Sequence, residues 1–354
     1  MEESVCTLRS PTDENTSEIC QCDECVLLAS NGFASGDAAS SNSTTKLRRV
    51  SSWIKIRRLI KWSPFVQIYQ MKEYPWVQLA GHQGNFQSAE NGKILKKTSK
   101  HEPIAYEFIF NKNKSDCIKK FLPEYYGITT ANDDNSTEYI ILEDLLKNFT
   151  SPTSVMDCKI GIRTYLEDEL EKASSDNHRQ DLYQKMIKVD PNAPTSEEKK
   201  AGAISKVRYM TWRENTSSSS QLGFRIEGIK YTNGESCTDF KKVKTVDDIR
   251  PHFRKFAPTC EVRRRILDRL RNMREVLPTS DFFAKHEIIG ASFLFIVDSK
   301  LKANVWIIDL GKTVRLPKDL SVTHQRVWER GNHEDGFLIG LDNIIAIWES
   351  IDRG

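Results

Sequence analysis

Short apolar or alternating segments recur along the C-terminal three quarters of the chain, and they predict β-strands. Successive side chains of a strand lie on opposite faces, so alternation indicates one buried and one exposed face. The predicted strands span residues 77–80, 92–97, 139–142, 222–230, 288–297 and 305–308. Asn233-Gly234 predicts a hairpin turn after the fourth of them.

Apolar residues at helical spacing predict a long amphipathic helix over residues 261–277. We interpret this helix as core scaffold without a chemical role. Its apolar stripe consists of Val262, Ile266, Leu270, Met273 and Leu277.

A polar, helical insert is predicted over about residues 166–213. Thr195-x-x-Glu198 forms a capping box that begins one of its helices, and the proline-containing run before it ends the preceding helix. That preceding helix has an apolar stripe at Leu182, Met186 and Val189. A charge-rich insert of this kind is usually solvated surface, but Arg and Lys side chains on one face would also bind a polyanion.

Two segments of different character precede the predicted strands. Residues 1–46 are rich in Ser, Asn, Asp, Glu and Thr, and such a composition predicts disorder. Residues 47–73 interleave Arg and Lys with bulky apolar residues and predict a basic amphipathic helix. Trp53, Ile56, Ile60 and Val66 form its apolar stripe. A calmodulin target, a membrane-surface segment and a helix packed on the following domain all fit this pattern.

Composition narrows the class of protein. The chain has 354 residues, 38% hydrophobic and 29% charged, as expected of a globular protein with some disordered sequence. Its net charge of +3 does not imply a nucleic-acid partner. No apolar run approaches a membrane span, and the acidic Met1-Glu2-Glu3 start is unlike a secretory signal. We therefore expect a cytoplasmic protein whose eight cysteines are reduced.

Candidate chemistry centres on Asp157 and Lys159. The two residues are separated by one position after the short apolar run Val155-Met156, and on a strand their side chains would share a face. A carboxylate can orient or deprotonate a hydroxyl, while a neighbouring ammonium compensates phosphate charge. Gly161 then allows close backbone approach. Taken alone, the same spacing is also that of an ordinary surface ion pair.

A second carboxylate, Asp309, follows the apolar strand 305–308 and precedes Gly311. A carboxylate at the end of a buried strand, beside a glycine that bends the chain, suits a magnesium ligand. An aspartate that merely begins a turn is the alternative.

These motifs resemble those of the inositol polyphosphate kinases. Pro152 followed by Asp157-x-Lys159-x-Gly161 is similar to the Pro-x-x-x-Asp-x-Lys-x-Gly signature of that family. The flanking sequences resemble the inositol trisphosphate 3-kinase branch from about Trp53 to the C-terminus. The flanking matches are residues 75–82, 208–214, 222–228 and 308–313.

The resemblance implies an α+β fold with two lobes, a protein-kinase-like ATP cleft and a helical substrate-binding insert. The catalytic domain would span residues 74–354, with a small lobe over 74–147 and a large lobe over 148–354. Calcium-loaded calmodulin would bind residues 47–73. The implied activity is ATP- and Mg²⁺-dependent phosphorylation of the 3-hydroxyl of inositol 1,4,5-trisphosphate, which tunes calcium signalling. A broader inositol polyphosphate multikinase and a non-catalytic inositol phosphate-binding module are the alternatives.

The resemblance also assigns roles to individual residues. Asp157 and Lys159 would be catalytic, and Asp309 would hold the metal with Ser292 nearby. The implied ATP-binding residues are Lys96, Glu143, Asp144, Leu145 and Asp309. The implied substrate-binding residues are Lys159, Arg179, Tyr209, Arg213 and Lys230. This chain departs from the family at Leu310, where the family usually has Phe, and we expect a packing change with metal binding retained.

Overall fold

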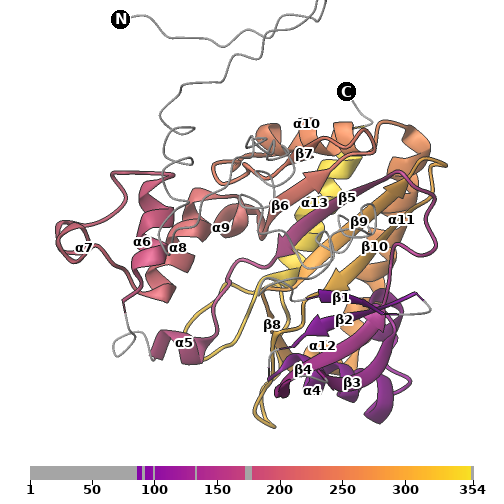
Figure 1. The fold of residues 1–354 in the computed structure, drawn as a ribbon, viewed down its shortest axis with the longest axis horizontal. Helices are drawn as coiled ribbons and strands as arrows, with labels where there is room; N and C mark the ends of the chain where they lie inside the picture. Colours follow the sequence, from indigo (N-terminus) through magenta and orange to yellow (C-terminus); the bar gives the residue numbers. More distant parts are fainter. Residues whose placement is uncertain (1–85, 90–91, 99, 132–133, 172–177, 352–354) are drawn as a thin grey trace, which may run out of the picture. The chain divides into compact units, whose positions relative to one another are not determined.

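The computed structural model describes residues 86–89, 92–98, 100–131, 134–171 and 178–351. The predicted strand 77–80, the predicted disordered segment 1–46 and the basic segment 47–73 lie outside the described residues. The described part combines helices with three antiparallel sheets, as expected for an α+β protein (Figure 1). Its helices include none with both the length and the apolar character needed to span a membrane.

The first sheet has four strands in the order β1-β2-β4-β3. Its strands are β1 (Phe86–Ala89), β2 (Lys93–Lys97), β3 (Tyr125–Ala131) and β4 (Asp134–Glu143). Helix α4 (Glu102–Glu107) follows β2 and continues into a π-helical turn over Phe108–Lys112; a 3₁₀ turn spans Cys117–Phe121. Tyr106 of α4 stacks on Tyr125 of β3, which fixes the helix to the sheet.

The second sheet has five strands in the order β10-β9-β5-β6-β7, so the motif strand β5 is at its centre. Its strands are β5 (Thr153–Ile160), β6 (Phe224–Lys230), β7 (Ser236–Cys237), β9 (Ser292–Asp298) and β10 (Ala303–Ile308). Since a central strand is paired on both sides, its residues are held more firmly than those of an edge strand.

Three helices pack against this sheet and complete the main core. Helix α11 contacts β10, α13 contacts β5 and β6, and α10 contacts α13. Phe253 of α10 stacks on Trp348 of α13 with ring centroids 4.5 Å apart, and Phe295 of β9 lies against both. The helices are α10 (Val246–Phe256), α11 (Cys260–Val276) and α13 (Phe337–Ile351).

The polar insert forms a helical layer with its own small core of Leu182, Met186, Ile204 and Trp212. Its helices are α5 (Glu167–Glu171), α6 (Gln180–Ile187), α7 (Ser196–Ala201), α8 (Lys206–Thr216) and α9 (Ser219–Leu222). The capping box predicted at Thr195 and Glu198 is confirmed at the start of α7. The last two helices extend the insert beyond the predicted boundary at 213, as far as β6.

Two strand predictions need correction. Residues 288–297 do not form one strand, because Gly290 has φ 74° and turns the chain. Strand β8 (His286–Ile289) instead pairs with β11 (Lys312–Arg315), separately from β9. The strand predicted from Leu222 begins at Phe224, since Leu222 ends α9 and Gly223 has φ 67°. A short helix, α12 (Asp281–Ala284), and a 3₁₀ turn (Leu277–Thr279) precede β8.

Candidate active site

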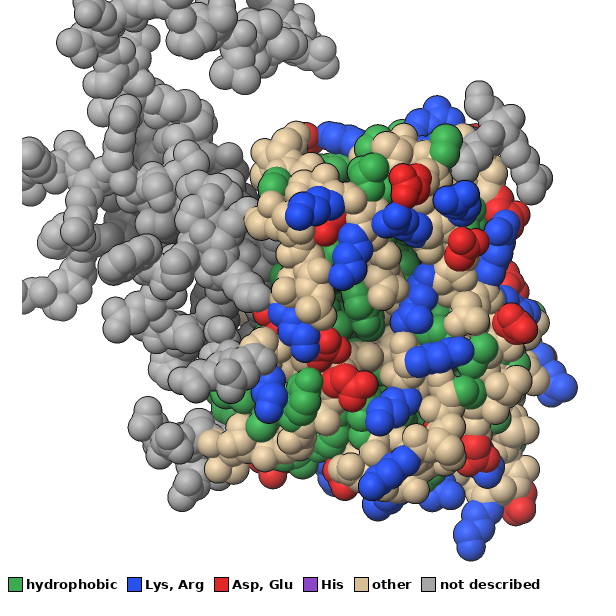
Figure 2. Space-filling view, turned by 90° about the vertical axis from the view of Figure 1, so that its right-hand side faces the viewer, with side chains coloured by type: hydrophobic (Ala, Val, Ile, Leu, Met, Phe, Trp, Pro, Cys, Tyr) green, Lys and Arg blue, Asp and Glu red, His purple; other side chains and the backbone are tan. Residues whose placement is uncertain are grey.

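A cavity of about 750 Å³ opens among the small sheet, the motif strand and the helical insert. Its lining has nine Lys or Arg residues and three carboxylates, so positive charge is concentrated there. On the outer face in Figure 2, by contrast, Lys and Arg are interspersed with Asp and Glu. The charged lining residues are Lys96, Lys97, Glu102, Lys159, Arg179, Lys206, Arg213, Arg225, Glu227, Lys241, Asp309 and Lys312.

At one end of the cavity, Lys96 forms ion pairs with both Glu102 and Asp309. Each Nζ–carboxylate distance is 2.5 Å. Burial acts to lower the pKa of Lys96, but the two carboxylates outweigh it and hold that pKa well above its usual value. Burial raises the pKa of Glu102. The arrangement fixes a cationic side chain from β2 against the β10–β11 connection, where phosphate groups of a nucleotide would bind.

Glu102 was not predicted from the sequence. It is the first residue of α4 and is 2% exposed. Kinase folds pair a strand lysine with a glutamate on a helix. An acidic residue six positions after Lys96 could therefore have been recognised as its partner.

Asp309 has a left-handed backbone with φ 65°, which turns its carboxylate away from the path of β10. Leu310, the departure from the family pattern, is fully buried in the main core. The leucine therefore serves packing, while the neighbouring carboxylate faces Lys96.

The structure places Asp157 and Lys159 on one face of β5, as predicted. Lys159 lies opposite Ser292 of β9 and Arg225 of β6 in the strand register. Its Nζ lines the cavity and donates to the Gly290 carbonyl at 2.8 Å. The turn that breaks the predicted long strand therefore supplies the acceptor that orients the lysine.

Asp157 is 2% exposed and does not itself line the cavity. Burial raises the pKa of this carboxyl group to about 7; Lys159 opposes the rise, and the Asp309 and Glu227 carboxylates add to it. The Ser292 hydroxyl on the neighbouring strand β9 is also buried and acts to lower the Asp157 pKa. A carboxyl group with a pKa near neutrality is suited to exchanging a proton.

A β-bulge in β6 shapes the same face. Asp157 pairs with Gly228 but Cys158 pairs with Ile226, so Glu227 is the extra residue. Lys230 is 1% exposed and pairs with Val155, on the Asp157 side of the sheet, and it does not line the cavity. Its contact with a substrate phosphate stays a prediction.

The insert contributes the other wall of the cavity. The predicted residues Arg179, Tyr209 and Arg213 all line it: Arg179 directly precedes α6, and the other two lie one turn apart on α8. Arg179 pairs with Asp181 at 2.7 Å, and Arg213 donates to the Lys241 carbonyl at 3.4 Å. Burial lowers the pKa of Arg213, with the Arg225 charge adding to the effect. Cationic lining residues outside the predicted site set are Lys97, Lys206, Arg225, Lys241 and Lys312.

The predicted adenine-binding segment 143–145 lies where β4 ends. Asp144 donates its backbone N–H to Gly92 and accepts from the Leu146 N–H at 3.0 Å, so a turn follows the strand. These residues do not line the cavity. Their contact with a nucleotide stays a prediction.

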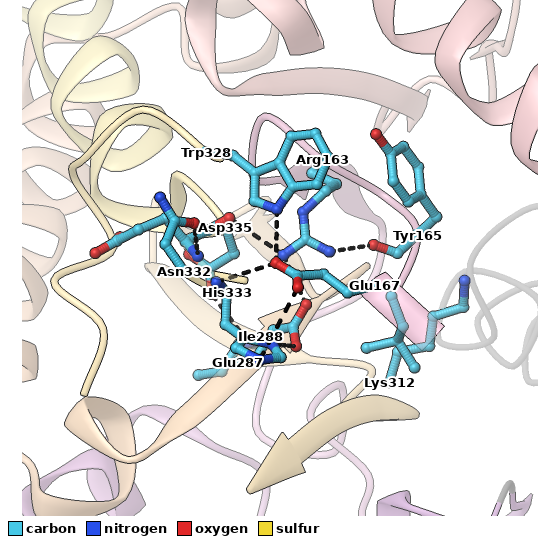
Figure 3. Close-up of polar contacts among 12 residues, drawn as sticks. Arg163, Tyr165, Glu167, Glu287, Ile288, Lys312, Trp328, Asn332, His333 and Asp335 are labelled. Carbon is cyan, nitrogen blue, oxygen red and sulfur yellow. Dashed lines mark hydrogen bonds and ion pairs between the residues drawn. The ribbon is translucent and has the colours of Figure 1, made fainter. Parts of the chain in front are cut away.

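A buried ionic network fixes the end of β5 to the insert (Figure 3). Arg163 pairs with Glu287 at 2.6 Å, and both side chains are 2% exposed. His333 Nδ1 lies 2.9 Å from the other Glu287 oxygen. Glu167 of α5 accepts from the Trp328 indole at 2.9 Å and from the His333 backbone. A charge held by several partners keeps one position, so the network determines where α5 begins.

A divalent cation would need oxygen ligands from several elements of this site. The described residues contain no group of three His, Cys, Asp or Glu side chains that could hold a metal alone. Asp309, with the buried Ser292 hydroxyl on the strand adjacent to β10, fits a hard cation whose remaining ligands are phosphate oxygens and water.

The inositol polyphosphate kinase family model matches residues 139–349. Human inositol-trisphosphate 3-kinase B is 47% identical over 304 residues, which are 85% of this chain and 31% of that protein. Mouse inositol-trisphosphate 3-kinase A is 46% identical over 307 residues, 85% of this chain and 64% of that protein. The chain thus spans from about a third to about two thirds of the length of these relatives.

Among solved structures, the inositol phosphate multikinase Ipk2 from S. cerevisiae aligns with 73% of this chain, at a TM-score of 0.48 and 15% identity. That structure was solved with ADP and Mn²⁺.

Proposed function

Because the chain belongs to the inositol polyphosphate kinase family, we propose that it transfers the γ-phosphate of ATP to the 3-hydroxyl of inositol 1,4,5-trisphosphate. Relatives 44–47% identical to it carry the name inositol-trisphosphate 3-kinase. The product would be inositol 1,3,4,5-tetrakisphosphate.

One observation carries the proposal. The Lys96–Glu102–Asp309 cluster, Lys159 and the cationic insert line one cavity, and the buried Asp157 lies on the same face of β5 as Lys159. Phosphoryl transfer requires mainly positioning of two anionic reactants and compensation of their charge. A cavity with this arrangement suits a nucleotide at the Lys96 end and an inositol phosphate at the Arg213 end.

Asp157 is the residue best suited to receive the proton of the attacking hydroxyl. Its carboxyl group is buried and its pKa is about 7, so it is partly deprotonated at neutral pH. Lys159, oriented by the Gly290 carbonyl, would hold the transferring phosphate and the substrate together. Arg179, Tyr209 and Arg213 would bind ring phosphates, with Lys230 as a further contact.

Asp309 and Ser292 would hold Mg²⁺ beside the nucleotide phosphates. The bound cation would neutralise charge that develops on the phosphate oxygens. Lys96 compensates charge at the same end, and residues 143–145 would hydrogen-bond adenine through backbone groups. We further propose that the protein is cytoplasmic. We also propose that calcium-loaded calmodulin binds the apolar stripe of the basic segment, which consists of Trp53, Ile56, Ile60 and Val66.

The test is turnover of radiolabelled ATP across inositol phosphate isomers, with and without calcium and calmodulin. We expect phosphorylation of the 1,4,5-trisphosphate at one position. Comparable turnover of several isomers would favour a multikinase, and binding without turnover would favour a non-catalytic binding module. Without binding of any inositol phosphate, the proposal fails.

A further inference from the structure

Two further cavity lysines share one anionic partner. Lys206 of α8 and Lys312 of β11 both line the cavity, and both donate to Glu169 of α5 at 2.6 Å. Lys206 contacts Oε1 and Lys312 contacts Oε2, so one carboxylate spans both ammonium groups. Lys312 also donates to the Thr164 carbonyl at 3.2 Å.

The position of Glu169 is fixed by more than its lysines. Its Oε2 accepts the Leu166 backbone N–H at 2.9 Å, in the manner of a helix-capping carboxylate. Two residues earlier, Glu167 is held by Trp328, Gly331 and His333 (Figure 3). Since both carboxylates lie on the same short helix, Glu169 cannot swing freely away when an anion enters.

Glu169 also keeps its charge under ordinary conditions. Burial acts to raise its pKa, but hydrogen bonds from Lys206 and Lys312 outweigh burial and lower that pKa to about 2. A phosphate group that approaches Lys206 or Lys312 therefore also approaches the negative charge of Glu169, which repels it.

We propose that Glu169 is a specificity-determining residue that limits how many phosphate groups the cavity accepts. This inference rests on the proposed function, because it concerns inositol phosphates in the same cavity. A trisphosphate can use cavity cations that donate to backbone carbonyls and not to Glu169, among them Lys159 and Arg213. An inositol phosphate with more phosphate groups must also place one of them near Lys206 and Lys312, where the Glu169 carboxylate repels it.

The experiment measures binding without ATP, by calorimetry, for an inositol tris-, tetrakis- and pentakisphosphate. Glu169→Gln removes the charge and keeps an oxygen acceptor for the Leu166 N–H. We expect it to raise affinity for the tetrakis- and pentakisphosphates by about tenfold more than for the trisphosphate. Glu169→Asp, which keeps the charge, should retain the original preference.

Glu171→Gln is the matched control. Glu171 is on the same helix, but it pairs with Arg330 at the surface, and both side chains are at least 60% exposed. It should leave all three affinities unchanged. An equal change for all three ligands in Glu169→Gln would overturn the inference and leave the proposed function standing. Failure of the unchanged protein to bind the trisphosphate would overturn both.

Discussion

Asp309 is a single side chain that joins the β10–β11 connection to Lys96 in the small sheet. We predict that Asp309→Asn lowers turnover by about a hundredfold or more, because charge stabilisation by a bound cation is worth several kcal/mol. Binding of inositol trisphosphate should survive, since Lys96 keeps Glu102 and the insert is untouched. Turnover and calorimetry on the same preparation check this. Asp319→Asn, at an exposed position, is the control, and lost binding with normal turnover would contradict the assignment.

Asp157 gives a second prediction, about stability. Its carboxyl group has a folded-state pKa of about 7, above its usual value of about 4. The raised pKa contributes stability that is fully present below pH about 4 and is lost as pH rises through 7. Asp157→Asn should therefore stabilise the ligand-free protein more at pH 8 than at pH 5, while it abolishes turnover. Thermal denaturation at both pH values measures the difference, and an equal effect at both would count against a buried, titrating carboxyl group.

The sequence predicts the roles of site residues that lie in short local motifs. It does not predict contacts between residues that are distant in the sequence and that only the fold brings together. Asp157 and Lys159 lie on a strand and Asp309 directly follows one, and in each case the neighbouring residues indicate the role. Glu169 contacts Lys312, 143 positions away, and no local pattern predicts that pair. The three predicted insert residues Arg179, Tyr209 and Arg213 were identified from the family resemblance and do line the cavity.

At the level of elements, helix α13 packs closely on the start of β6. A Cβ on Gly340 would lie 2.1 Å from the Gly223 carbonyl oxygen and 2.5 Å from Ile160 Cδ1. Helix propensity favours Ala over Gly by about 1 kcal/mol, but backbone atoms cannot move aside as a side chain can. We predict that Gly340→Ala destabilises the protein by about 1–3 kcal/mol, as overpacking does.

Urea denaturation measures this effect. Ala346→Gly, at an exposed position of the same helix, is the control for propensity and should cost about 1 kcal/mol. If Gly340→Ala were instead stabilising, the close approach of α13 to β6 would not exist in solution.

Hydrophobic periodicity predicts whether a segment is a helix or a strand more reliably than it predicts the residues at which the segment begins and ends. The stripe over 261–277 predicted α11 to within a residue at each end, because a long amphipathic helix repeats its signal several times. The break at Gly290 was missed, since an apolar run continues through both strands and only the positive φ separates them. Helix α4 was also missed: it has six residues, too few for a periodic pattern.

For the molecule as a whole, the remaining prediction concerns the segment before the described residues. Arg and Lys in residues 47–66 would repel one another in a buried helix, so an acidic partner is favoured. Trp53 and the isoleucine stripe offer apolar surface to the same partner. We predict that Trp53→Ala in the full chain reduces both calmodulin affinity and calcium stimulation, and leaves basal turnover intact, because no catalytic or substrate-binding role is assigned to Trp53.

A peptide of residues 47–70 isolates the binding step. It contains Trp53 and Trp62, so a Trp62→Phe version reports on Trp53 alone. We expect a blue shift of its fluorescence on addition of calcium-loaded calmodulin, as the indole leaves water for an apolar groove, and reversal on removal of calcium. Anionic vesicles provide the competing partner for the same basic helix. A blue shift with vesicles and none with calmodulin would assign the segment to a membrane surface, and calcium stimulation of the full chain would then be absent.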